Sequence, residues 1–184
     1  PAARLIELAG FYQRTGPMRT ARFAFGDTMS VSLLSDDLIT LAHRVIAENR
    51  ALGRTVALAE SCTGGLVAAA LTEIPGSSAV LDRGFVTYSN EAKHESLGVS
   101  NDIIDTFGAV SIACAWAMAQ GAIRVSRADV AVAVSGIAGP DGGTEKKPVG
   151  TVCIAWVGPG FSEVVRRRFS GSERQEIRQQ VVNF

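Results

Sequence analysis

The chain of 184 residues lacks a surplus of charge and has few cysteines and histidines. Its 18 basic and 18 acidic side chains cancel, which argues against a general nucleic-acid-binding protein because phosphate affinity needs a basic surplus. Its three cysteines are an odd number in a chain too large for a disulfide scaffold, and with two histidines they form no zinc-ligand spacing. We therefore expect Cys62, Cys114 and Cys153 to be buried thiols in a reducing cytoplasm, and no bound metal.

Long hydrophobic runs are also missing. No apolar stretch reaches the roughly 20 residues that cross a bilayer, so we expect a soluble protein with no membrane partner. Apolar residues nevertheless make up 47% of the chain, which excludes disorder as the main state. The length suits one domain.

The first 30 residues differ from the rest in composition. They are rich in arginine, poor in acids and show no sustained apolar period. Serine is too scarce there for an organelle transit peptide, so we interpret residues 1–30 as an N-terminal extension with Met29 as the natural start. The domain itself is expected over residues 31–184.

Hydrophobic periodicity and capping residues predict alternating helices and strands after the extension. Helices are predicted over 35–52, 66–72, 90–96, 102–107, 111–125 and 173–182, and strands over 55–59, 80–89, 129–134, 149–157 and 163–169. The strand at 129–134 is continuously apolar, which is typical of burial on both faces. This alternation predicts a single three-layer α/β/α domain with a mixed sheet.

Ser61 is the first candidate for chemistry, because it lies on a tight turn between a predicted strand and a predicted helix. A serine there exposes its hydroxyl, and amides at the start of the helix can hold an anion. Gly64 and Gly65 permit close approach of a substrate to the backbone. The turn is not the G-x-S-x-G elbow, since Ala59 and Thr63 occupy its glycine positions. A helix-capping serine is the alternative.

A serine nucleophile needs a base, and neither histidine lies in a triad context. Lys93 can serve if burial lowers its pKa, and a change from about 10.4 to around 7.5 corresponds to roughly 4 kcal/mol. Tyr88 is placed to pass a proton or to orient the lysine. The alternatives are a solvated lysine and a strand tyrosine with an exposed hydroxyl.

The glycine-rich loop 135–143 is the third candidate. It follows a buried strand and so lies at the carboxyl end of the sheet, where open α/β folds bind ligands. Its spacing matches neither the dinucleotide fingerprint nor the phosphate loop of nucleotide triphosphatases. We expect its backbone to approach a small polar ligand, with a purely structural turn as the alternative.

Five motifs are specific as an ordered set, although each alone is weak. They are residues 59–65 (AESCTGG), 84–90 (GFVTYSN) with Lys93, 108–111 (GAVS), 135–143 (SGIAGPDGG) and 147–152 (KPVGTV). In these motifs the chain resembles, from about residue 33 onward, the CinA C-terminal domain family. That domain occurs in competence/damage-inducible proteins and alone as a nicotinamide mononucleotide deamidase.

The resemblance implies a cytoplasmic amidohydrolase of pyridine nucleotide salvage, which converts nicotinamide mononucleotide to nicotinate mononucleotide and ammonia without a metal or other cofactor. It implies Ser61 as nucleophile, Lys93 and Tyr88 as proton-handling partners, and amides near residues 63–65 as the oxyanion site. The implied substrate-binding residues are Thr63, Gly64, Gly65, Asn90, Ser135, Gly136, Ile137, Ala138, Gly139 and Arg174. We expect a homo-oligomer, with a dimer as the default, and no nucleic-acid partner.

The chain departs from the family near its C-terminus. Ser172 and Glu173 stand where a family G-D-R element has one aspartate, which leaves Arg174 or, as the second choice, Arg178 as the phosphate contact. Arginines outnumber acids over 162–184, as a phosphate contact would require. The family's last helix runs further than Phe184, so we expect a short or truncated end.

Two alternative functions stay open. One is a catalytically silent nucleotide-binding module linked to competence or the DNA-damage response, and the other is an amidase of another small amide. Ammonia release from nicotinamide mononucleotide separates the first alternative from the amidohydrolase, and a panel of amides separates the second.

Overall fold

The structure is a computed structural model that describes residue 32 and residues 34–184, so the expectations for residues 1–30 lie outside the described residues. In chain order the elements are α2 (Asp36–Ala51), β1 (Val56–Glu60), α3 (Leu66–Thr72), the short 3-10 helix η1 (Ser77–Ala79), β2 (Leu81–Val86), α4 (Asn90–Leu97), α5 (Asn101–Phe107), α6 (Ile112–Val125), β3 (Val130–Gly136), β4 (Thr151–Gly158), β5 (Phe161–Arg168) and α7 (Arg174–Val182).

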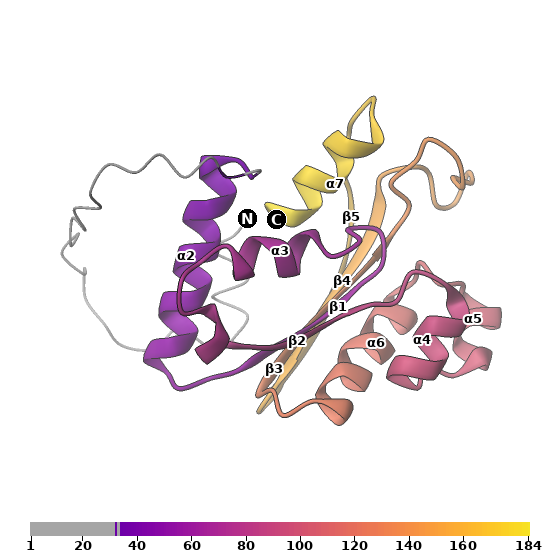
Figure 1. Ribbon diagram of the computed structural model, residues 1–184. Coiled ribbons are helices and arrows are strands. Elements are labelled where there is room, and N and C mark those ends of the chain that lie inside the picture. The colour runs from indigo at the N-terminus through magenta and orange to yellow at the C-terminus, as the bar shows by residue number, and fades with distance from the viewer. Residues whose placement is uncertain (1–31, 33) are drawn as a thin grey trace.

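One mixed sheet forms the middle layer, with the strand order β2-β1-β3-β4-β5. Strand β1 runs parallel to β2 and β3, whereas β4 is antiparallel to both β3 and β5. Helices α2, α3 and α7 cover one face of the sheet, and α4, α5 and α6 cover the other (Figure 1). The predicted three-layer α/β/α fold is confirmed.

Serine side chains begin several of these helices, as the capping signals predict. Ser35, Ser89 and Ser111 each accept a hydrogen bond from a backbone N–H in the first turn of the helix that follows. The strand predicted over 80–89 is shorter than expected and ends at Val86. The reason is that residues 87–89 lead into α4, where Ser89 Oγ accepts from the Ala92 N–H.

Small residues bring α6 close to the sheet and to α4. The core on this side is built from α6 residues Cys114, Ala115, Met118, Ala119 and Ala122 against alanines of β1, β3 and β4. At Gly121 the backbone of α4 approaches so closely that an added Cβ would lie 2.8 Å from Leu97 Cβ. Arg124 Nη2 also donates to the Leu97 carbonyl at 2.6 Å. Helix α4 is therefore held firmly against the α6 layer.

The other face of the sheet is covered by larger apolar side chains. Val56 and Leu58 of β1 pack with Ile46 of α2 and Leu71 of α3. All three cysteines are buried free thiols, as predicted. Among the described residues, no helix combines the length and hydropathy needed to cross a bilayer.

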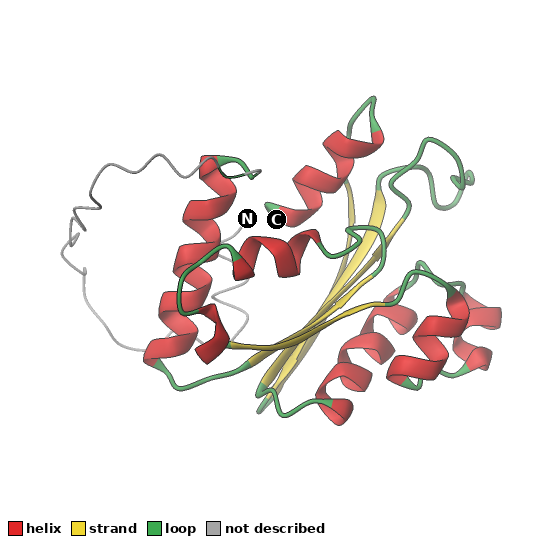
Figure 2. Cartoon of the chain, in the orientation of Figure 1, coloured by secondary structure: helices red, strands yellow, loops and turns green. Residues whose placement is uncertain are grey.

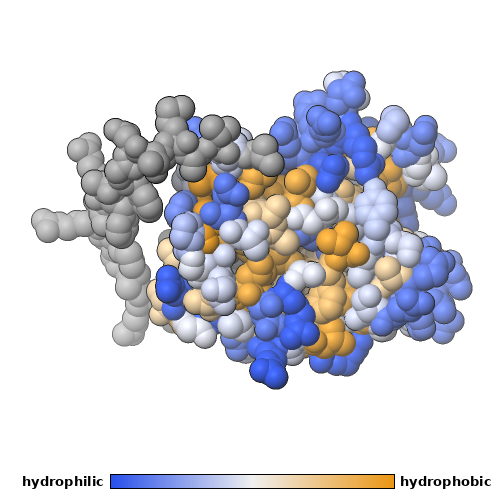
Figure 3. All heavy atoms as spheres, in the orientation of Figure 1, coloured by the Kyte–Doolittle hydropathy of each residue, from blue (hydrophilic) through white to orange (hydrophobic). Residues whose placement is uncertain are grey.

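The arginines of the C-terminal stretch are divided between two places. Arg166, Arg167 and Arg168 lie on β5, an edge strand of the sheet, whereas Arg174 and Arg178 lie on α7. Hydrophilic side chains gather over α7 at the top of the view in Figure 3. Of these arginines, only Arg174 and Arg178 are thus placed to contact a ligand at the carboxyl end of β1.

Candidate active site

The parallel register brings the ends of three strands together around Ser61. Glu60, the last residue of β1, pairs with Val86 of β2 on one side and with Val134 of β3 on the other. The ladder continues past it, since the Ser61 N–H donates to the Val134 carbonyl at 2.9 Å and the Thr87 N–H to the Glu60 carbonyl at 2.8 Å. The loops that follow these strands gather at this end of the sheet (Figure 2).

Ser61 and Lys93 meet directly at this end. Lys93, on α4, places Nζ 3.2 Å from Ser61 Oγ. The same Nζ donates to the backbone carbonyls of Thr87 at 2.9 Å and Ser89 at 3.4 Å. Lys93 is 1% exposed and Ser61 9% exposed. The structure therefore brings together the serine and the lysine that the sequence singles out.

Burial lowers the pKa of Lys93 from its ordinary value of 10.5, because the charged form is desolvated. The two nearby thiols, Cys114 and Cys62, and the exposed carboxylate of Glu91 act in the opposite direction. Among the described residues, no carboxylate lies within ion-pair distance of Lys93. A neutral Lys93 would keep its two N–H groups for the two carbonyls and turn its lone pair toward the Ser61 hydroxyl, which is the geometry of a general base.

Tyr88 takes a different place from the one expected. Its side chain is 59% exposed, and its hydroxyl accepts a hydrogen bond from Arg174 Nη2 at 2.5 Å. Arg174 Nη1 also donates to the Gly139 carbonyl at 2.7 Å. Within the described part of the chain, Tyr88 forms no hydrogen bond with Ser61 or Lys93. Tyr88 thus belongs to a contact that joins α7, the loop after β3 and the entry to α4.

Arg178 reaches the Ser61 turn from the next turn of α7. Its Nη2 donates to the Thr63 carbonyl at 2.7 Å, and a Cβ on Gly64 would lie 3.3 Å from the same nitrogen. Both arginines weighed for the phosphate therefore reach the region, but with different roles. Arg178 is engaged with the turn, whereas Arg174 sits between Tyr88 and Gly139.

The amides of Gly64 and Gly65 are engaged within the turn, in contrast to the oxyanion role expected for them. The Gly64 N–H donates to the Ser61 carbonyl at 3.0 Å, and the Gly65 N–H to Glu60 Oε2 at 3.0 Å. Their φ angles of 61° and 94° explain why glycine is needed here. Among the described residues, the Thr63 N–H donates to no other residue, and the Cys62 N–H faces only its own thiol.

Glu60 is a buried residue of this region that sequence reasoning misses. Its buried carboxylate accepts hydrogen bonds from the turn and from the first residues of α3. The available signal is an acidic residue directly before a glycine turn that starts a helix, where the helix dipole favours negative charge.

The other side of Ser61 is formed by the end of β3. Ser135 is buried, and its hydroxyl donates to the Ala109 carbonyl at 2.7 Å, so it supports the segment before α6. Gly136 has no room for a side chain, since a Cβ would lie 2.6 Å from Val152 Cγ2 and 3.0 Å from Cys62 Sγ. Glycine there allows β3 to lie against the residue that follows Ser61.

The remaining predicted contacts lie around this centre. Ile137 is held by a backbone hydrogen bond from its N–H to the Thr151 carbonyl at 2.9 Å. Ala138 and Gly139 are buried in the same loop, and the Gly139 carbonyl faces Arg174. Asn90 is exposed at the first position of α4. The structure thus places Asn90 on the exposed edge of the candidate site and the loop that contains Gly139 beside α7.

Comparison with known proteins identifies the domain. The family model of the CinA C-terminal domain matches residues 38–184. The chain belongs to the CinA C-terminal domain family. It is 46% identical over 152 residues to the nicotinamide-nucleotide amidohydrolase PncC of Escherichia coli K12, covering 83% of this chain and 92% of that protein.

Other members of the CinA family are longer or have solved structures. A putative competence-damage inducible protein of Symbiobacterium thermophilum is 49% identical over 165 residues, which cover 86% of this chain but 37% of that protein. The crystal structure of the competence/damage inducible protein CihA from Agrobacterium tumefaciens superimposes with a TM-score of 0.79 at 52% identity, covering 83% of this chain and 93% of that one. The chain thus spans about a third of some curated relatives and nearly all of others.

Cys62, next to Ser61 in this CinA family member, is not activated. Burial raises the pKa of its thiol from 9.0 to about 11. A backbone hydrogen bond and the charges of Arg174 and Arg178 lower it, while the Glu60 carboxylate adds to the rise. The Cys62 thiol therefore stays protonated at neutral pH, which disfavours it as a nucleophile.

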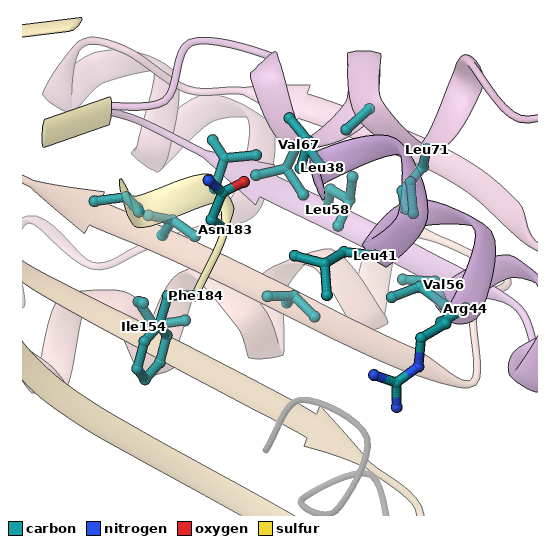
Figure 4. Close-up of a pocket in the computed structure, with 17 residues that line it drawn as sticks. Leu38, Leu41, Arg44, Val56, Leu58, Val67, Leu71, Ile154, Asn183 and Phe184 are labelled. Atoms are coloured by element: carbon teal, nitrogen blue, oxygen red, sulfur yellow. The ribbon is translucent and has the colours of Figure 1, made fainter. Parts of the chain in front are cut away.

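An apolar cavity of about 90 Å³ in this CinA domain lies away from the Ser61–Lys93 pair. It lies between α2, α3, the sheet and the end of α7, with Leu41, Leu58 and Phe184 among its lining residues (Figure 4). Neither Ser61 nor Lys93 lines it. Its lining suits an apolar group rather than a phosphate. Among the described residues, no group of three or more His, Cys, Asp or Glu could hold a metal ion.

Proposed function

We propose that this protein is an amidohydrolase that converts nicotinamide mononucleotide and water to nicotinate mononucleotide and ammonia. The observation that carries the proposal is the buried pair of Ser61 Oγ and Lys93 Nζ, 3.2 Å apart, with two backbone carbonyls around the amine. The names of relatives such as E. coli PncC support the same substrate. Together they favour acyl transfer by a serine with a lysine base.

In the proposed mechanism, neutral Lys93 takes the proton of the Ser61 hydroxyl as Oγ attacks the carboxamide carbon. The tetrahedral intermediate then collapses, the carbon–nitrogen bond breaks, and Lys93 returns the proton to the departing nitrogen as ammonia. Water attacks the resulting ester while Lys93 accepts its proton. Release of the acid returns that proton to Ser61.

The negative charge of the intermediate needs donors near Ser61. We assign this role to the N–H groups of Cys62 and Thr63, since those of Gly64 and Gly65 are engaged within the chain. Arg174 is the proposed phosphate contact. It is fixed by Tyr88 and Gly139 and retains further guanidinium N–H groups for an anion. In this scheme Tyr88 positions Arg174 and does not carry a proton.

Ammonia release from nicotinamide mononucleotide tests the proposal. We expect wild-type turnover, and a loss of at least about 10³-fold in kcat for Ser61→Ala and for Lys93→Met, because each removes one member of a unit. Lys146→Met is the matched control, since Lys146 is an exposed lysine outside the site. Full turnover by Ser61→Ala would overturn the mechanism, and tight binding of the mononucleotide without ammonia would favour a silent binding module.

The expected homodimer and the cytoplasmic location stay predictions. Support for a subunit contact comes from the exposed apolar side chains of Phe107, Ile112 and Trp116, which line one surface cleft with Val164. Sedimentation velocity measures the mass of the species in solution. A monomer at micromolar concentration would contradict the dimer.

A further inference from the structure

The carboxylate of Glu60 is enclosed by donors from the Ser61 turn and from α3. Glu60 is 1% exposed. Its Oε2 accepts hydrogen bonds from Thr63 Oγ1 at 2.6 Å, from the Gly65 N–H at 3.0 Å and from the Val67 N–H at 3.2 Å. Its Oε1 accepts from the Ala68 N–H at 2.9 Å. These donors span the whole segment between the nucleophile and the first turn of α3.

Within the described residues, no lysine or arginine forms an ion pair with Glu60. Its charge is balanced by backbone N–H groups at the start of α3 and by the Thr63 hydroxyl. Such hydrogen bonds are directional, so they fix the path of residues 61–65 as well as satisfying the carboxylate. The amides of Gly65, Val67 and Ala68 are consequently unavailable to an outside anion.

We propose that Glu60 is a positioning residue for the Ser61 nucleophile. It ties the turn to the end of β1 so that Ser61 Oγ stays at Lys93 and the N–H groups of Cys62 and Thr63 face the reacting carbonyl. This rests on the proposed function in that Ser61 is taken as the nucleophile. The geometry of the turn itself is independent of the substrate.

A carboxylate is the group that fits this place. Glutamine has the same volume but only one acceptor oxygen. Whichever carboxylate oxygen its NH₂ replaces, that NH₂ would face a backbone N–H donor. If its oxygen replaces Oε2, the Ala68 N–H is left without a partner. Alanine leaves every donor unpaired and opens a space the size of a small carboxylic acid.

Glu60→Ala is expected to lower kcat on nicotinamide mononucleotide by about 10²-fold, the effect of a displacement of about 1 Å in the reacting groups. KM should stay within about threefold, because Arg174 is untouched. Added acetate or propionate should fill the space and restore kcat at least about fivefold, whereas chloride at equal ionic strength should not. Glu60→Gln should lose less activity and show no rescue, since its side chain fills the space.

Glu73→Ala is the matched control, because Glu73 is an exposed acid at the other end of α3 and should leave kcat unchanged. Crystal structures of Glu60→Ala and Glu60→Gln, grown without carboxylates, give a readout that needs no substrate. We expect the 3.2 Å contact between Lys93 and Ser61 to open in Glu60→Ala. If wild type released no ammonia, the proposed substrate would fail, and this contact would still decide the role of Glu60.

Three results would overturn the proposal. They are a kcat of Glu60→Ala within twofold of wild type, equal rescue by chloride and carboxylates, and an unchanged Lys93–Ser61 contact in the variant structure. If Glu60→Ala does not fold, Glu60→Gln decides between the outcomes. A wild-type kcat and an intact Lys93–Ser61 contact in that variant would equally refute a positioning role.

Discussion

Replacing Gly121 by alanine tests whether the close packing of α6 on α4 sets the position of Lys93. The new Cβ would lie 2.8 Å from Leu97 Cβ and closer still to the Leu97 carbonyl oxygen. Ordinary carbon–carbon contacts are about 3.5–4.0 Å, so the two helices must separate by roughly 0.7 Å or more. Lys93 lies one turn before Leu97 on α4 and moves with it.

Two opposing effects set the stability of Gly121→Ala. Alanine favours the helix by about 1 kcal/mol over glycine. Overpacking costs about 1–3 kcal/mol, and here the neighbour is backbone that cannot swing aside. We therefore expect a net loss of up to about 2 kcal/mol in the free energy of unfolding. At about 2–4 °C per kcal/mol for a chain of this size, Tm falls by several degrees.

The catalytic effect of Gly121→Ala should exceed the stability effect. A displacement of about 1 Å in a catalytic group costs up to about 10²-fold in rate, so a shift of roughly 0.7 Å should lower kcat by about tenfold or more. Thermal unfolding and ammonia release measure the two effects. Gly171→Ala is the control for stability, because its Cβ would lie 3.0 Å or more from its nearest neighbours, which are side-chain atoms of Glu176 and Ile177 rather than backbone. An unchanged or higher Tm with wild-type kcat would refute the reasoning.

Four further predictions concern the site. Since burial lowers the pKa of Lys93 below 10.5, kcat/KM should rise with pH up to that lowered value. Between the lowered pKa and 10.5, the unfolded chain binds more protons than the folded one. The free energy of unfolding of wild type should therefore rise with pH in this window relative to that of Lys93→Met. A difference between the two proteins that does not change with pH would contradict this. Arg174→Ala should raise KM by about tenfold or more at similar kcat. Tyr88→Phe should raise KM less than Arg174→Ala does and leave the pH profile of kcat/KM unchanged. A shifted pH profile would instead indicate that Tyr88 carries a proton. Iodoacetamide at neutral pH should leave Cys62 unmodified in the folded protein, as mass spectrometry can show, because its pKa is raised to about 11.

Local signals explain how much of the fold is predictable from the sequence. The bounds of α3 and the capping of α6 by Ser111 follow from neighbours in the chain, and the structure agrees with them. The Ser61–Lys93 pair could also be predicted from the sequence, because the two residues follow adjacent parallel strands. Parallel strand ends meet at one edge whatever the details of packing.

Contacts between distant segments are what the sequence could not reveal. Tyr88 and Arg174 are 86 positions apart, and their hydrogen bond depends on where α7 lies on the sheet. The engagement of Gly65 by Glu60 depends on the backbone turning back on itself through two positive φ angles. No periodic pattern encodes either arrangement, so the roles of Tyr88, Glu60 and the glycine amides needed the three-dimensional structure.

The arginines of β5 also bear on how the protein behaves at high concentration. An edge strand offers unpaired N–H and C=O groups to any other strand. On β5, Arg166, Arg167 and Arg168 would bring three cations of one molecule toward the same cations or backbone of a second copy. Their repulsion and hydration discourage growth of the sheet from this edge. The same residue type is therefore the proposed phosphate contact on α7 and a protection from aggregation on β5.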